Sequence, residues 1–134
     1  MSHHNVFLVY LLTLLIFLAI DSFWLSLVSP KLYKRYLKPI LAEKPNFWAA
    51  AIFYLIFIIG LLYFVVYPNK TDSYSHIILS SAMYGLMTYA TFDLTNQAIL
   101  KKWSYIISLI DIIWGIIIAT VTTLIITRIF FKWK

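Results

Sequence analysis

The chain has 134 residues, of which 63% are hydrophobic and 12% charged, and its mean hydropathy is +0.88. Because soluble domains usually carry about 25% charged residues, this composition excludes an ordinary soluble protein and predicts one polytopic membrane domain. With no cysteine, disulfides and thiolate chemistry are excluded, and the net charge of +6 lies mainly in loops and tails, where it favours anionic lipid headgroups over nucleic acid.

Four apolar segments follow one another along the chain, each long enough for the roughly 20 helical residues that a bilayer requires. Asn46 is expected to cap the second segment and Pro68 to end it. Because two connections are short, neighbouring helices should pack antiparallel. The predicted fold class is therefore all-α, a polytopic four-transmembrane-helix up-down bundle. Its spans are expected at about residues 6–28, 47–67, 74–100 and 104–130.

The segment from about residue 30 to 42 is amphipathic rather than apolar throughout. Its pattern predicts a short interfacial helix between the first two spans, which Pro39 should kink or end. A solvated loop is the alternative interpretation. The predicted contacts with anionic headgroups are Lys31, Lys34, Arg35 and Lys38.

Basic residues are unevenly divided between the two ends of the predicted bundle. The loops after the first and third spans contain seven lysines and arginines, and the opposite side has four, including Lys132 and Lys134. The positive-inside rule then places the basic loops in the cytoplasm and both termini outside. Because the difference is small, an inverted or dual orientation stays open.

Three aspartates interrupt the apolar segments at similar depth. With a rise of 1.5 Å per residue, Asp21, Asp93 and Asp111 each lie about 7 to 9 Å from the midplane, all displaced towards the basic loops. A charged carboxylate at the centre of a membrane helix costs about 2.5–3.5 kcal/mol, so such residues usually mark a pathway, a relay or a binding site. We therefore expect one buried acid layer with a function.

Aromatic and amide side chains accompany the acids at helical spacing. Trp24 and Trp114 each follow an aspartate by three residues, which puts each pair on one helix face. The second span has no acid and is expected to contribute a tyrosine. The predicted ligand or proton site comprises Asp21, Trp24, Tyr54, Tyr89, Asp93, Asn96, Asp111 and Trp114.

The chain resembles a family of bacterial predicted membrane proteins, domain of unknown function 2177. The resemblance rests on the string from Tyr89 to Ala98, with its Asp-Leu-Thr-Asn core, on Asp111-Ile-Ile-Trp-Gly115 and on Asp21-x-x-Trp24-Leu25. Phe92 stands where the family pattern suggests a tyrosine. The resemblance implies four membrane helices, a bacterial inner (cytoplasmic) membrane location and functional weight on the aspartates and Asn96, with no established activity.

Three hypotheses for function follow from the acid layer. Close carboxyl groups in a low dielectric tend to share a proton, and aromatic faces attract cations, so the leading hypothesis is binding or transport of a cation, a proton-coupled solute or a small lipophilic molecule. A homodimer is the expected way to enclose a pathway. The second hypothesis is an intramembrane enzyme that acts on a lipid through paired aspartates. The third is a purely structural hydrogen-bonded bundle.

Cofactor and metal chemistry find little support in the sequence. None of the histidines lies on the acid face of a span, and no nucleophile motif is present, so we lean away from an enzyme. The oxygen ligands of the acid layer would suit Mg²⁺ or Ca²⁺, but no metal-binding motif accompanies them. We expect no cofactor and no resident metal.

Overall fold

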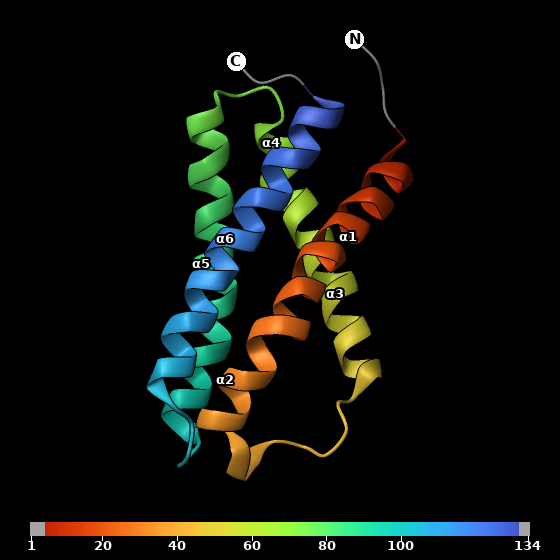
Figure 1. The fold of residues 1–134 in the computed structure, drawn as a ribbon. Coiled ribbons are helices and arrows are strands. Elements are labelled where there is room, and N and C mark those ends of the chain that lie inside the picture. The colour runs from red at the N-terminus through yellow and green to blue at the C-terminus, as the bar shows by residue number, and fades with distance from the viewer. Residues whose placement is uncertain (1–4, 132–134) are drawn as a thin grey trace.

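The computed structural model describes residues 5–131 of the chain, so Lys132 and Lys134 lie outside the described residues. This part is helical and contains no strand. Four helical rods stand side by side, and the start of the first rod and the end of the last lie at the same end of the bundle (Figure 1). The all-α prediction is confirmed. The rods are α1–η1–α2 (Val6–Phe23, Trp24–Val28, Ser29–Tyr36), α3–η3–α4 (Phe47–Leu61, Leu62–Val66, Tyr67–Asn69), α5 (Tyr74–Ile99) and α6 (Tyr105–Phe130).

Only three of these rods are long and apolar enough to count as membrane spans by length and composition. They are Val6–Tyr36, Phe47–Asn69 and Tyr105–Phe130. The prediction of four spans is therefore supported for three of them. α5 is equally long but falls short because serine, threonine, asparagine and glutamine are interspersed with its apolar residues.

The predicted separate interfacial helix at about residues 30–42 is corrected by the structure. The first rod continues without a break to Tyr36, and after Leu37 a single 3₁₀ turn, η2 (Lys38–Ile40), leads into the loop. The physical reason is that Pro30 occupies the first turn of α2, where its missing N–H is tolerated.

Wide π-helical turns precede both prolines that lie inside the rods. In η1 the backbone N–H of Ser29 bonds the Trp24 carbonyl, and in η3 that of Tyr67 bonds the Leu62 carbonyl, both across five residues. Proline removes one ordinary helical hydrogen bond and crowds the carbonyl four residues before it, so a widened turn relieves the crowding. Each turn rotates the segment that follows it about the helix axis.

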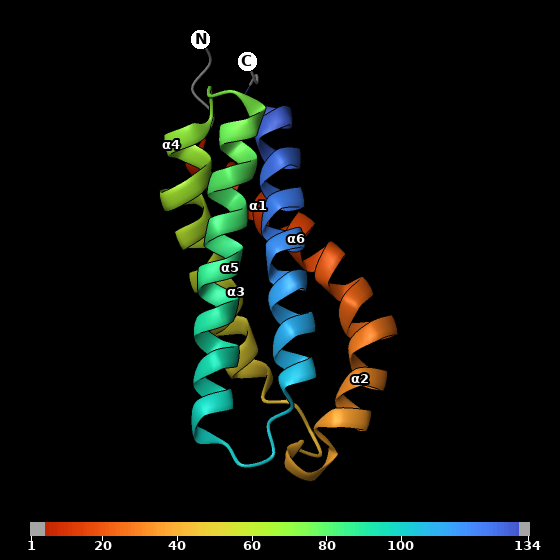
Figure 2. The same cartoon turned by 90° about the vertical axis from the view of Figure 1, so that its left-hand side faces the viewer.

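α5 and α6 form the most extensive interface, and they run side by side over their whole length (Figure 2). Gly85 and Gly115 face each other across this interface, so closely that a Cβ on Gly85 would meet the backbone of α6. Small residues permit such proximity between membrane helices. Near the end where the termini lie, the bundle is filled by a core of buried apolar side chains that includes Phe57, Ile58 and Ile118.

Replacing Gly85 with Ala should destabilise the protein by about 1–3 kcal/mol, because added bulk in a close-packed interface forces a backbone shift. The new Cβ would lie 2.8 Å from the carbonyl carbon of Gly115 and 2.9 Å from Cα of Ile116. Thermal unfolding in detergent measures the loss. Gly60→Ala is the control, since its Cβ meets the end of the Tyr84 side chain and no backbone atom, and should cost less. Equal losses in the two variants would contradict this account of the interface.

Candidate functional site

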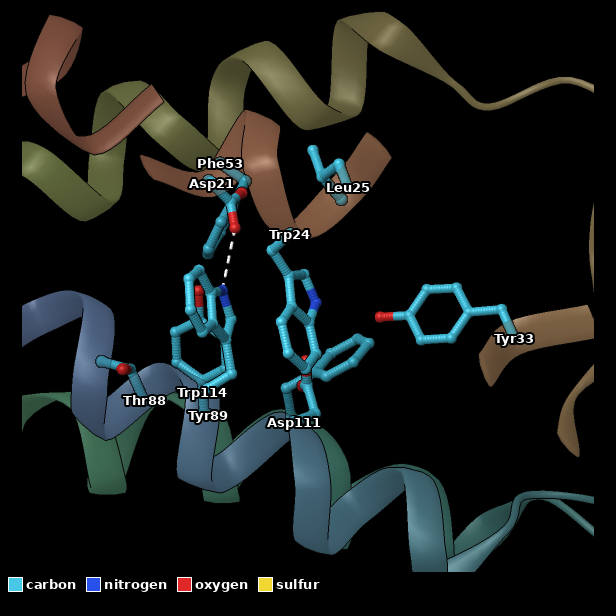
Figure 3. A pocket seen from close by; sticks show the side chains of 10 residues that line it. Asp21, Trp24, Leu25, Tyr33, Phe53, Thr88, Tyr89, Asp111 and Trp114 are labelled. Carbon is cyan, nitrogen blue, oxygen red and sulfur yellow. Dashed lines mark hydrogen bonds between the residues drawn. The ribbon is translucent and has the colours of Figure 1, made fainter. Parts of the chain in front are cut away.

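Asp21 lies near the end of α1 and joins three helices through its carboxylate. The hydroxyl of Tyr54 on α3 donates to Oδ2, and the indole Nε1–H of Trp114 on α6 donates to Oδ1 at 3.0 Å (Figure 3). Asp21 is 6% exposed. Both of its oxygens are therefore satisfied by neutral donors, as a buried carboxylate requires.

Asp93 and Asp111 form a second, different acid group between α5 and α6. Asp93 is fully buried, and neither of its carboxyl oxygens has a hydrogen-bond donor when both acids are ionised. The two carboxyl groups are close enough for a side-chain hydrogen bond once one of them carries a proton. This pair therefore needs a proton or a cation, because a buried acceptor without a donor is unfavourable.

A cavity of about 340 Å³ lies beside the acids and is lined from all four rods. Asp21 and Asp111 border it, and none of its lining residues is basic. Trp24 and Trp114 stack beside it with ring centroids 4.6 Å apart and planes 9° apart. Figure 3 shows the Tyr33 hydroxyl pointing into this space from α2. The remaining lining residues are Leu25, Phe53, Thr88, Tyr89 and Phe92.

The structure brings most of the sequence-predicted site together. Asp21, Trp24, Tyr89, Asp111 and Trp114 line the cavity. Two further predicted residues act through the lining acids, since Tyr54 donates to Asp21 and Asp93 pairs with Asp111.

Asn96 does not line the cavity, and the neighbouring Gln97 makes the polar contacts in this part of α5. Gln97 Nε2 donates to the Trp103 carbonyl at 2.9 Å, and its Oε1 accepts from Ser108 at 3.1 Å. Trp103 Nε1–H donates to the same Ser108 hydroxyl at 2.9 Å. This network fastens the α5–α6 turn beneath the acid pair. The sequence feature that could have identified Gln97 is its position four residues after Asp93, on the same helix face.

Tyr33 was missed as a site residue because its segment was assigned to the membrane surface. Its position is nevertheless marked by a pattern, since Ser29, Tyr33 and Leu37 follow at steps of four. Ser29 and Leu37 are buried, whereas the basic residues of the segment are exposed. A second, inward-facing stripe was thus readable beside the basic one.

The four predicted headgroup contacts, Lys31, Lys34, Arg35 and Lys38, all have exposed side chains at the end of the bundle opposite the termini. The Arg35 guanidinium lies over the Tyr36 ring, 5.4 Å from its centroid. Their contact with lipid stays a prediction. Within residues 5–131, no three histidine, aspartate or glutamate side chains are grouped so as to hold a metal ion.

Comparison with known proteins places the chain in a family. Residues 6–127 match the sequence profile of the predicted membrane proteins called domain of unknown function 2177. The chain belongs to this family. The match includes the three buried aspartates and all four rods except the last three residues of α6, which confirms the resemblance seen in the sequence. Neither a curated protein nor a solved structure matches the chain.

Proposed function

We propose that this protein binds a cation at the acid cavity in exchange for a proton, as the first step of transport across the membrane. One observation carries the proposal: two buried aspartates and a stacked tryptophan pair border a single cavity that no basic residue lines. Acids buried within apolar helices usually serve a pathway or a binding site. Aromatic faces add attraction for a positive charge.

The two acid groups have separate roles in this proposal. Asp21 already accepts hydrogen bonds from Tyr54 and Trp114, which hold both of its carboxyl oxygens in a fixed position beside the cavity. Asp93 and Asp111 share one proton when the cavity is empty. When a cation enters beside Asp111, the shared proton leaves the pair, so the net charge of the site changes little.

We further propose that α5 is the fourth membrane span. Its hydroxyl groups bond carbonyls of their own helix, as in Ser81 to Ile77 at 2.7 Å and Thr91 to Met87 at 2.6 Å, which makes them tolerable in lipid. Its outer face is apolar, with Leu79, Met87 and Leu94 all exposed. With four spans, the basic loops would face the cytoplasm of a bacterial cell and the termini the outside.

Cation binding can be tested by thermal unfolding of the detergent-purified protein with chloride salts of Na⁺, K⁺ and benzyltrimethylammonium. At least one cation should raise the Tm by about 3 °C or more at ten times its dissociation constant. Asp111→Asn should abolish the shift, because the variant cannot present a carboxylate to the cation.

Asp72→Asn is the matched control, since Asp72 lies in the connection between α4 and α5 and should leave the shift intact. The binding proposal fails if no cation stabilises the parent, or if Asp111→Asn responds as the parent does. Proteoliposomes loaded with the stabilising cation then test transport, which requires uptake driven by a proton gradient.

A further inference from the structure

The border of the cavity is apolar where it reaches the surface. Among the lining residues, only Leu25, Phe53 and Phe92 have exposed side chains, at 47%, 46% and 56% respectively. They belong to three different elements, η1, α3 and α5. A rim of exposed apolar side chains in a bundle of apolar helices is suited to contact with lipid acyl chains.

Building on the proposed function, we infer that the cation is a lipophilic organic ammonium ion that enters sideways from the bilayer between Leu25, Phe53 and Phe92. The interior has the matching chemistry. The carboxyl groups of Asp21 and Asp111 can pair with the positive charge of the ammonium group. The stacked rings of Trp24 and Trp114 can pack against its apolar substituents and attract the cation through their faces. A hydrated inorganic ion would make no direct contact with the rings of Trp24 and Trp114.

The size of the cavity agrees with such a ligand. A volume of about 340 Å³ lies at the lower end of the roughly 300–1,000 Å³ typical of small-molecule sites. It suits one aromatic ring with a substituted ammonium group. Benzyltrimethylammonium is therefore a suitable probe, and its uncharged carbon analogue, neopentylbenzene, has nearly the same shape.

The part of α3 that borders the opening is only partly buried. Along residues 47–56 of α3, no side chain is buried. The ring partners of Phe53 are Tyr54 and Phe57, both on its own helix. α5 packs against η3 and, through Tyr84 and Tyr89, against Phe57 of α3, all farther along the rod. Turning Phe53 aside would therefore break ring contacts within its own helix only.

Ligand class is tested by isothermal titration calorimetry of the full-length protein in detergent. The parent should bind benzyltrimethylammonium at least about tenfold more tightly than tetramethylammonium, and neopentylbenzene should show no saturable binding. Trp24→Leu should weaken benzyltrimethylammonium binding about threefold or more, because it removes one aromatic face. Trp48→Leu is the control, since Trp48 is 84% exposed on α3 and does not line the cavity.

Sideways entry is tested with a nitroxide spin label on Phe92→Cys, which introduces the only thiol into a chain without cysteine. In liposomes, the label should collide more often with oxygen than with a water-soluble nickel complex. Bound benzyltrimethylammonium should restrict the motion of the label. A label on Lys101→Cys, in the α5–α6 connection, should show the opposite preference.

Failure of this inference differs from failure of the proposed function. If Na⁺ or K⁺ stabilises the parent but not Asp111→Asn, while benzyltrimethylammonium binds no better than tetramethylammonium, the ligand class is wrong and cation binding stands. A nickel-accessible label at position 92 overturns entry from the bilayer. Absence of any cation response removes the proposed function, and the inference with it.

Discussion

Replacing Asp93 with Asn should leave the protein folded and in the membrane but abolish the pH dependence of its stability. By the proposed function, Asp93 and Asp111 of the folded chain share one proton, because the buried Asp93 oxygens have no other donor, and the unfolded chain, with ionised aspartates, releases it above pH about 5. The unfolded state then binds fewer protons than the folded state, so stability falls as the pH rises, by up to about 1.4 kcal/mol per pH unit.

The pH dependence should disappear because the Asn amide donates a hydrogen bond to Asp111 without needing a proton from water. The measurement is the Tm of parent and variant across pH about 5 to 9. A difference in the number of protons bound by the folded and unfolded states appears as a slope of Tm against pH. Asp72→Asn should retain the parental slope. An unchanged slope in Asp93→Asn, with only a lower Tm at every pH, would show that the pair serves packing alone and holds no exchangeable proton.

Replacing Asp21 with Leu should be among the most destabilising single changes in the chain. It leaves two donors, the Tyr54 hydroxyl and the Trp114 indole N–H, without their acceptor in a half-buried setting. Each unpaired buried donor costs about 1–3 kcal/mol. Denaturant titration in detergent, followed by circular dichroism, measures the total loss.

A second substitution separates the hydrogen bonds from simple packing. Adding Tyr54→Phe to Asp21→Leu should restore about 1 kcal/mol or more of the free energy of unfolding, because it removes one of the two donors left without an acceptor. Tyr54→Phe alone should instead destabilise the parent, since it takes a donor from the Asp21 carboxylate. Strictly additive losses in the double variant would contradict the assigned bonds.

The cavity depends on features that are not visible along a single helix. Tyr33 reaches it because η1 inserts one residue into the turn, which rotates α2 by about 100° relative to an uninterrupted helix. Gln97, and not Asn96, fastens the α5–α6 turn because only its side chain points at Trp103 and Ser108. The orientation of these side chains cannot be read from the spacing of apolar residues, since in α1, α3, α5 and α6 the apolar residues are not confined to one face.

The amino-acid sequence by itself determined the helical class, the membrane setting and the approximate ends of the rods, apart from the C-terminal end of the first. It also predicted a common depth for Asp21, Asp93 and Asp111. These properties follow from composition and from the constant rise of a helix, both of which are local. Only the tertiary structure decided that Asp21 is satisfied by Tyr54 and Trp114 while Asp93 depends on Asp111. That difference arises from which donors neighbouring helices present to each carboxyl group, and helix rotation and packing set it.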